Sequence, residues 1–161
     1  MTPSSDLLRE QLVRLLDWED AHAGFDTAVD GVPLERQGAV AAGFEHTPWQ
    51  LLEHMRIAQN DLLDFCLNPR YAHELAWPED YWPRDPAPPG PTAWNESIAS
   101  FKADREGFTQ LVRDPRLDLL ATVPTGRDQQ TYLRAVLLAA DHNAYHLGQL
   151  VAVRRALGIW R

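Results

Sequence analysis

Hydrophobic residues recur at helical spacing along most of this chain. The first such segment runs from about Asp6 to Val29, and its apolar stripe is marked by four leucines, Leu8, Leu12, Leu15 and Leu16. The second begins at Thr47-Pro48, where an N-cap residue precedes a proline at the first helical position, and it ends near Asn68-Pro69. Both segments are long enough to predict amphipathic helices.

Two further helices are predicted in the second half of the chain. One covers about Thr92 to Arg113, and the other runs from about Gln129 to Leu157, with Gly158 as its C-terminal stop. Residues 135–140 of the last helix are apolar all round, which predicts a central and well-buried position. The pattern as a whole indicates an all-α fold in a single domain over residues 1–161.

The connection between the second and third helices is long and rich in proline. Residues 69–91 contain seven prolines, so this segment cannot be helical. At about 3.3 Å per residue it can cross the full length of a helix bundle, which allows the second and third helices to run parallel. Its aromatic residues have no helix of their own. We expect them to cap the bundle, line a pocket or form an interface: Tyr71, Trp77, Tyr81 and Trp82.

Composition narrows the class of protein. The formal net charge is −8, and the densest basic spot is the pair Arg154-Arg155, which argues against a nucleic-acid partner. The single cysteine, Cys66, excludes an internal disulfide and a cysteine-rich zinc module. Neither a secretory signal nor an apolar run of about 18–20 residues is present, so we expect a soluble, cytoplasmic protein without membrane contact.

The chemistry-bearing residues are histidines. His142 and His146 lie four residues apart in the last helix, so both imidazoles leave the same face and can hold one divalent metal. His54 lies about 80° from the centre of the second helix's apolar face, where it can point inward beside a neighbouring helix. Three imidazoles form a catalytic-type metal site in which further coordination positions stay open. Cys66 lies about 120° around the helix from His54, which predicts a small core residue rather than a ligand.

Two other metal motifs are excluded by particular residues. The zincin motif HExxH needs glutamate where this chain has Asn143, so its general base is missing. A di-iron carboxylate site needs two Glu-x-x-His motifs, and the chain offers one, Glu19 to His22. On the first predicted helix His22 and Glu19 both fall on the side of the apolar stripe, where they would face the bundle interior. His22 and Glu19 are either additional groups of the metal site or polar residues without a metal role near the end of the apolar stripe. His46 and His73 fall in predicted loops, where we expect exposure.

Taken together, these residues resemble the DinB-like superfamily. The resemblance lies in TPWQLLEHMRIAQ and, most specifically, in DHNAYHLGQLVAVRRALG, and it covers nearly the whole chain. It implies a four-helix bundle with up-down-down-up topology, in agreement with the long crossover loop. It also implies a divalent metal, zinc or nickel, on His54, His142 and His146, and a homodimer. Relatives include thiol-dependent transferases and the mycothiol-dependent maleylpyruvate isomerase, which use low-molecular-weight thiols.

Two interpretations of function follow from this site. The first is a metal-dependent enzyme acting on a small-molecule substrate by thiol transfer or hydrolysis. The second is a non-catalytic, stress-response bundle in which the metal mainly stabilises the fold. An open coordination position beside a pocket favours the enzyme, whereas a closed tetrahedral shell favours the structural role.

Overall fold

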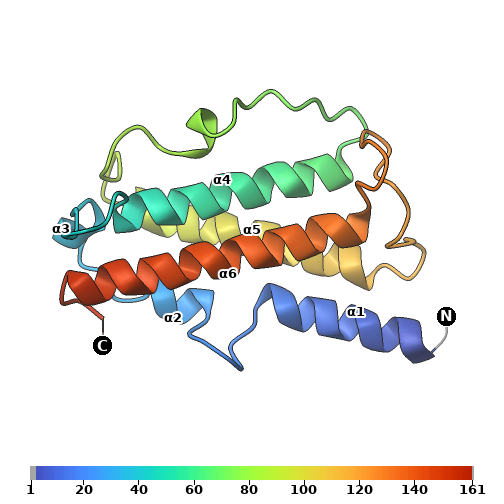
Figure 1. The fold of residues 1–161 in the computed structure, drawn as a ribbon, viewed down its shortest axis with the longest axis horizontal. Coiled ribbons are helices and arrows are strands. Elements are labelled where there is room, and N and C mark those ends of the chain that lie inside the picture. The colour runs from blue at the N-terminus through green and yellow to red at the C-terminus, as the bar shows by residue number, and fades with distance from the viewer. Residues whose placement is uncertain (1–2, 161) are drawn as a thin grey trace.

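The computed structural model describes residues 3–160, and in this part of the chain the fold is all-helical (Figure 1). No strand occurs among these residues, and the one β-bridge joins Thr122 to Thr131. None of the described helices combines the length and the apolar character needed to cross a bilayer. The elements in chain order are α1 (Pro3–Leu16), α2 (Phe25–Val29), α3 (Leu34–Gln37), α4 (Pro48–Leu67), the 3-10 helix η1 (Glu79–Tyr81), α5 (Ala93–Arg113) and α6 (Tyr132–Ala156).

The ends of the two helices that carry the histidines are set by local sequence. Thr47 begins α4 with a capping box, in which its hydroxyl accepts from the backbone N–H of Gln50 and the Gln50 side chain accepts from the N–H of Thr47. Thr131 caps α6 in the same way through the N–H of Arg134. Gly158 follows α6 with φ of +71°, a left-handed conformation that suits glycine, so the predicted stop is confirmed.

The first predicted helix is wrong in its second half. Helix α1 ends at Leu16, residues 17–24 are irregular, and the helical path resumes only in the short α2. The apolar stripe explains the break: three and four residues beyond Leu16 stand Glu19 and Asp20, so a continuous helix would turn carboxylates toward the core. In the fold Asp20 forms an ion pair with Arg14 at the surface instead.

Helices α4, α5 and α6 form the centre of the fold, and α1 packs along α5 and α6 (Figure 1). Gly107 allows α5 to approach α4 closely, because a Cβ at this position would lie 2.7 Å from a methyl carbon of Leu63. The buried apolar residues form two clusters, one around Leu52, Phe101 and Leu150 and the other around Phe108 and Val136. On α6 the stretch between these clusters carries the histidines.

The crossover loop returns along α4 before α5 begins (Figure 1). It is tied to the start of α4 by the Thr47 hydroxyl, which donates to the carbonyl of Pro86 at 2.6 Å. Further along α4, Asp61 accepts hydrogen bonds from the hydroxyls of Tyr71 and Tyr81 at 2.8 and 2.5 Å. Apart from η1 the loop is not helical, as expected from its prolines.

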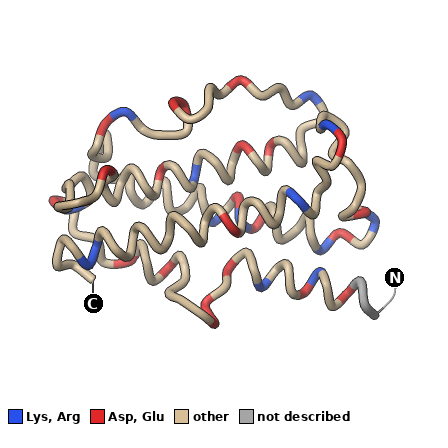
Figure 2. Tube along the Cα trace, in the orientation of Figure 1, with Lys and Arg blue, Asp and Glu red and all other residues tan. Residues whose placement is uncertain are grey.

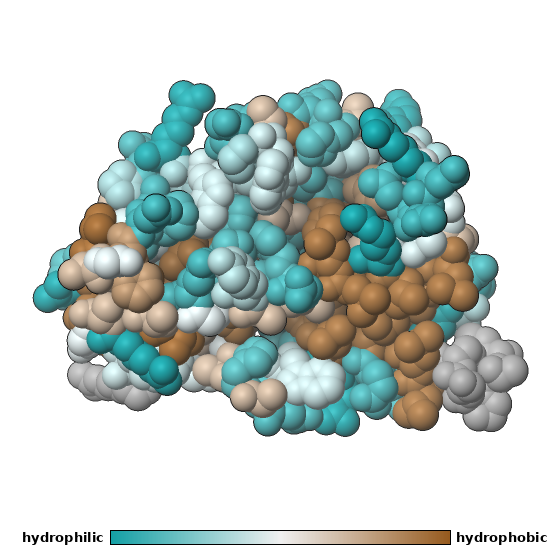
Figure 3. All heavy atoms as spheres, viewed as in Figure 1, coloured by the Kyte–Doolittle hydropathy of each residue, from teal (hydrophilic) through white to brown (hydrophobic). Residues whose placement is uncertain are grey.

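Helix α6 is less buried than its sequence predicts. Ala135, Val136, Ala139 and Ala140 are buried, but Leu137 and Leu138 are 44% and 39% exposed. Figure 3 shows hydrophobic side chains gathered over the first half of α6 and the adjoining α1. We call this surface the apolar patch; the exposed leucines of these two segments are Leu7, Leu8, Leu137 and Leu138. The all-apolar stretch predicts burial on every side, whereas in the fold one side of it faces outward.

Charged residues are distributed over all elements (Figure 2). Acidic and basic residues both occur along the whole trace, and the surplus of acidic residues gives the formal net charge of −8. This distribution agrees with the absence of a basic cluster in the sequence.

Candidate metal centre

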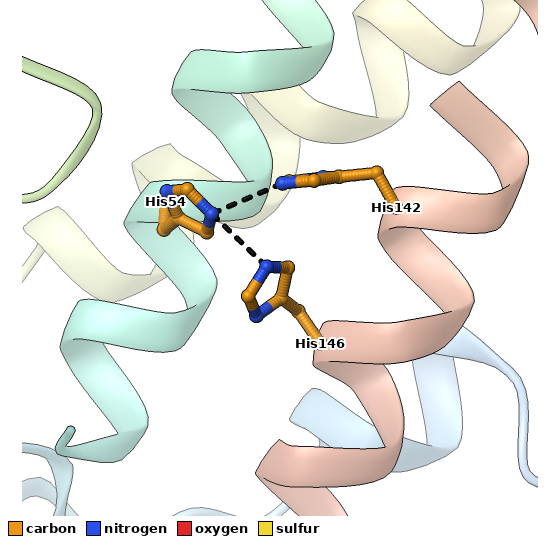
Figure 4. Close-up of side chains that lie close together, drawn as sticks. All are labelled: His54, His142 and His146. Atoms are coloured by element: carbon orange, nitrogen blue, oxygen red, sulfur yellow. Dashed lines mark hydrogen bonds between the residues drawn. The ribbon is translucent and has the colours of Figure 1, made fainter. Parts of the chain in front are cut away.

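Three histidines from two helices meet between α4 and α6 (Figure 4). His54 extends from α4, and His142 and His146 extend from successive turns of α6. The Nε2 atom of His54 lies 3.0 Å from that of His142 and 3.1 Å from that of His146. The structure therefore brings together the three histidines that sequence spacing singled out, each offering one ligand atom to a common space.

Hydrogen bonds on the far side of two rings fix where the protons are. His54 Nδ1 lies 2.8 Å from the carbonyl oxygen of Tyr81, and His146 Nδ1 lies 2.7 Å from the amide oxygen of Gln149. A carbonyl oxygen can only accept, so each Nδ1 carries the proton and each Nε2 presents a lone pair. Two lone pairs thus face each other across 3.1 Å, an arrangement that a shared cation stabilises.

Burial keeps these rings neutral. His54 is 1% exposed and His146 is 8% exposed. Removal from water lowers the pKa of His54 to about 4, although the bond to the Tyr81 carbonyl opposes this shift. Burial likewise lowers the pKa of His142 to about 4 and lowers the pKa of His146. All three rings are therefore neutral near neutral pH, the state that a metal ligand needs.

The separations of His54 Nε2 from the other two Nε2 atoms fit a first-row divalent metal. With metal–nitrogen bonds of about 2.0–2.1 Å, ligand atoms around a tetrahedral ion lie about 3.3 Å apart, and adjacent ones around an octahedral ion about 2.9 Å apart. The observed 3.0 and 3.1 Å fall between these values. Neutral nitrogen donors with orienting hydrogen bonds form the donor set that zinc and nickel accept.

Aromatic residues of the crossover loop cover His54. The ring of Trp82 stacks on that of His54 at 3.7 Å with an interplanar angle of 4°, and His46 stacks on the other side of Trp82 at 3.8 Å. His46 is consequently half-buried rather than exposed as its loop position predicted. From the sequence, the loop aromatics are expected to cap the bundle, line a pocket or form an interface. In the fold Trp82 and Tyr81 line the histidine site, where the Trp82 ring and the Tyr81 carbonyl contact His54.

A buried and a half-buried amide side chain link the helices that carry the histidines to α5. Asn143 donates to the amide oxygen of Gln59 at 2.8 Å, and Gln59 donates to the carbonyl of Phe101 at 2.7 Å. This chain of hydrogen bonds links α6, α4 and α5. Asn143, which excluded the zincin motif, therefore joins helices in the core.

A cavity of about 670 Å³ adjoins the histidines on the side of His142. It lies between α4, α6 and the crossover loop. Its wall includes Asp61 together with the two tyrosines that donate to it, and His73 lies 3.0 Å from the Tyr81 hydroxyl. Burial, reinforced by the bond to Asp61, raises the pKa of both tyrosine hydroxyls, so they stay protonated donors.

Other residues weighed from sequence lie apart from the histidine group. His22 is exposed in the irregular segment after α1, with Nδ1 3.0 Å from the Ala23 carbonyl, and Glu19 is also exposed. Their predicted inward position depended on a helix that ends at Leu16. Cys66 is 6% exposed, as expected of a core residue, and burial raises the pKa of its thiol to about 12. His73 is exposed, as predicted.

Sequence reasoning missed the residues that orient and cover the ligands. Gln149 lies three residues after His146, and this spacing was a usable signal because side chains at i and i+3 are neighbours on a helix. The other orienting group is a backbone carbonyl, that of Tyr81, which carries no side-chain signal at all. Trp82 reaches His54 only through the path of the loop.

Comparison with known proteins supplies the family. No curated protein and no solved structure gave a match to this chain. The sequence model of the DinB superfamily matches residues 17–150, a range that includes all three histidines and most of the chain. The chain therefore belongs to the DinB superfamily.

Proposed function

We propose that His54, His142 and His146 bind one divalent metal ion, zinc or nickel, through their Nε2 atoms. The observation that carries this proposal is the pair of hydrogen bonds that fix protons on the Nδ1 atoms of His54 and His146, leaving lone pairs directed at one point. Burial, which disfavours protonation of the rings, supports the same assignment.

The protein is then a metal-dependent enzyme that acts on a small molecule, by thiol transfer or hydrolysis, with a low-molecular-weight thiol as a candidate co-substrate. A divalent ion on three neutral imidazoles keeps its full charge and can lower the pKa of a bound water or thiol toward neutrality. The Tyr81 carbonyl and Gln149 orient the ligands, and Trp82 excludes water from one face of His54. The cavity beside His142 supports an enzyme, because it offers room for a substrate.

A structural role for the metal is the second candidate. His54 is almost fully buried and the other two ligands come from a different helix, so a metal here would tie α4 to α6. A ligand present at about 100 times its dissociation constant adds about 2.7 kcal/mol to stability. The two candidates differ in whether an exogenous molecule gains access to the metal.

Metal analysis of purified protein, followed by a screen of small thiols and electrophiles, tests both candidates. One equivalent of zinc or nickel, with turnover that chelation removes, supports the enzyme. One equivalent with no turnover and a large rise in melting temperature supports the structural role. If the protein, reloaded with either metal, retains none after gel filtration, the metal proposal is wrong.

Three further features belong to this proposal. The four longer helices form an up-down-down-up bundle, and the protein works in the cytoplasm. It is a homodimer that buries the apolar patch on α1 and α6, since exposed leucines are gathered there (Figure 3).

A further inference from the structure

The cavity beside His142 has an ordered wall along α6. Arg134, Leu138 and His142 follow one another at intervals of four residues, so they occupy one side of the helix. Eight residues of helix advance about 12 Å, which separates the backbone positions of Arg134 and His142. The wall therefore runs from a guanidinium at one end, across a leucine, to an imidazole of the metal centre.

The opposite walls are mostly apolar and aromatic. Leu62 and Phe65 come from α4, and Tyr71, Trp77 and Tyr81 come from the crossover loop. Phe65 and Tyr71 pack edge to face at 5.3 Å, and Trp77 and Tyr81 do so at 5.1 Å. Such walls accept a flat or apolar body rather than a strongly hydrated one.

The charged groups on the cavity are distributed unevenly. Its acidic group, Asp61, already accepts two tyrosine hydrogen bonds, one on each carboxylate oxygen. The cationic groups are Arg127 and Arg134, and neither forms an ion pair with a carboxylate of residues 3–160. In a chain with a formal net charge of −8, two unpaired guanidinium groups on one cavity provide a place for an anion.

We propose that this cavity is the substrate site and that its substrate is a small aromatic or apolar molecule with an anionic group, held by Arg127 and Arg134. The other end of the molecule then lies toward His142. The inference rests on the proposed function in one respect, that the end at His142 is the reactive end. Arginine suits the task because its planar fork binds two oxygens of a carboxylate, sulfonate or phosphate at once.

The test compares two probes that differ in charge and share their aromatic body. We use 2-naphthalenesulfonate and the neutral methyl 2-naphthyl sulfone, and measure binding by titration calorimetry to zinc-loaded and to chelator-stripped protein. A sulfonate is a poor metal ligand, so its preference reports the arginines. Both arginines are exposed, and we expect the anion to bind about tenfold more tightly than the sulfone, as two solvent-exposed charge pairs together would give. Raising the salt from about 0.05 to 0.5 M should reduce this preference.

Paired variants assign the preference to the cavity. Arg127→Gln/Arg134→Gln should reduce sulfonate affinity to that of the sulfone, each single variant should have part of this effect, and Arg36→Gln, an exposed arginine on α3, should have none. Leu138→Trp should block both probes, whereas Leu34→Trp, at an exposed leucine on α3 outside the cavity lining, should not. Circular dichroism confirms that the variants are folded.

Three results would overturn the inference: no binding of either probe to the wild type, no preference for the anion, or a preference that survives in the folded double variant. These results are distinguishable from failure of the metal proposal. The arginine-dependent preference should persist in stripped protein, so it stands even if the three histidines bind no metal. Conversely, a protein that binds zinc but shows no such preference keeps its metal site and loses this substrate class.

Discussion

Gln149 allows a direct test of the idea that fixed protons make the histidines a metal site. Its amide oxygen accepts a hydrogen bond from His146 Nδ1, and the two atoms lie 2.7 Å apart. Gln149→Leu keeps the side-chain size and removes the acceptor. The proton is then free to move to Nε2, where it can donate to His54 across 3.1 Å and so stabilise the metal-free state. In the variant the His146 ring is no longer oriented toward the metal. The repulsion between the Nε2 lone pairs of His54 and His146, which a bound metal would relieve, is also lost.

The expected magnitude follows from this geometry. Loss of a group that orients a metal-bound histidine typically weakens metal affinity about 10- to 100-fold, which corresponds to about 1.4–2.7 kcal/mol. Competition for zinc or nickel against a chromophoric chelator measures this change. Gln149→Glu keeps an acceptor at the same place, so it should bind metal at least as tightly as the wild type.

The control is Gln110→Leu, an exposed glutamine on α5 that bonds to Glu106 at 3.3 Å. It should leave affinity unchanged. The reasoning is refuted if Gln149→Leu binds metal within about twofold of the wild type, or if Gln149→Glu is as weak as Gln149→Leu. Either result would mean that the tautomer of His146 does not depend on this hydrogen bond.

Three other predictions concern the same molecule. His142→Ala should abolish tight metal binding, and with it the metal-dependent gain in melting temperature, which is about 5–10 °C for about 2.7 kcal/mol. Far-ultraviolet circular dichroism should stay helical. If the variant retains one equivalent of metal at wild-type affinity, another ligand exists. In metal-free protein the pKa of His54 is about 4 in the folded state and 6.5 in the unfolded state. Between these two pH values the unfolded chain therefore binds more protons than the folded protein. The free energy of unfolding should fall by up to about 3 kcal/mol as pH drops from 6.5 toward 4. Urea unfolding across this range checks it. His54→Gln should reduce the dependence and leave the part due to His142 and His146, whose pKa values are also lowered, whereas the exposed His22→Gln should not change it. A dependence that His54→Gln leaves fully intact would assign it elsewhere. Leu137→Glu should convert the proposed dimer to a monomer of 18.3 kDa in sedimentation, whereas Leu34→Glu on α3 should not; a wild type that is monomeric at micromolar concentration would contradict the interface.

The sequence by itself determined the helices and part of the site. Apolar periodicity, the Thr47 capping box and Gly158 act within a few residues of each other, so the limits of α4 and the end of α6 could be predicted. The pairing of His142 with His146 is equally local, because helical geometry alone puts residues four apart on one face. The end of α1 was also encoded, since Glu19 and Asp20 interrupt its stripe, although we predicted a longer helix.

The tertiary structure decided what depends on how helices are rotated and where the loop passes. The meeting of His54 with the α6 pair required α4 to pack against α6 with that side inward. The Tyr81 carbonyl and the Trp82 ring reach His54 from 27 and 28 residues away in sequence, through a loop without periodicity. Exposure of Leu137 and Leu138 followed from the same packing. Hydrophobic pattern tells which residues avoid water, but the partner surfaces that cover them are fixed only when all the helices are in place.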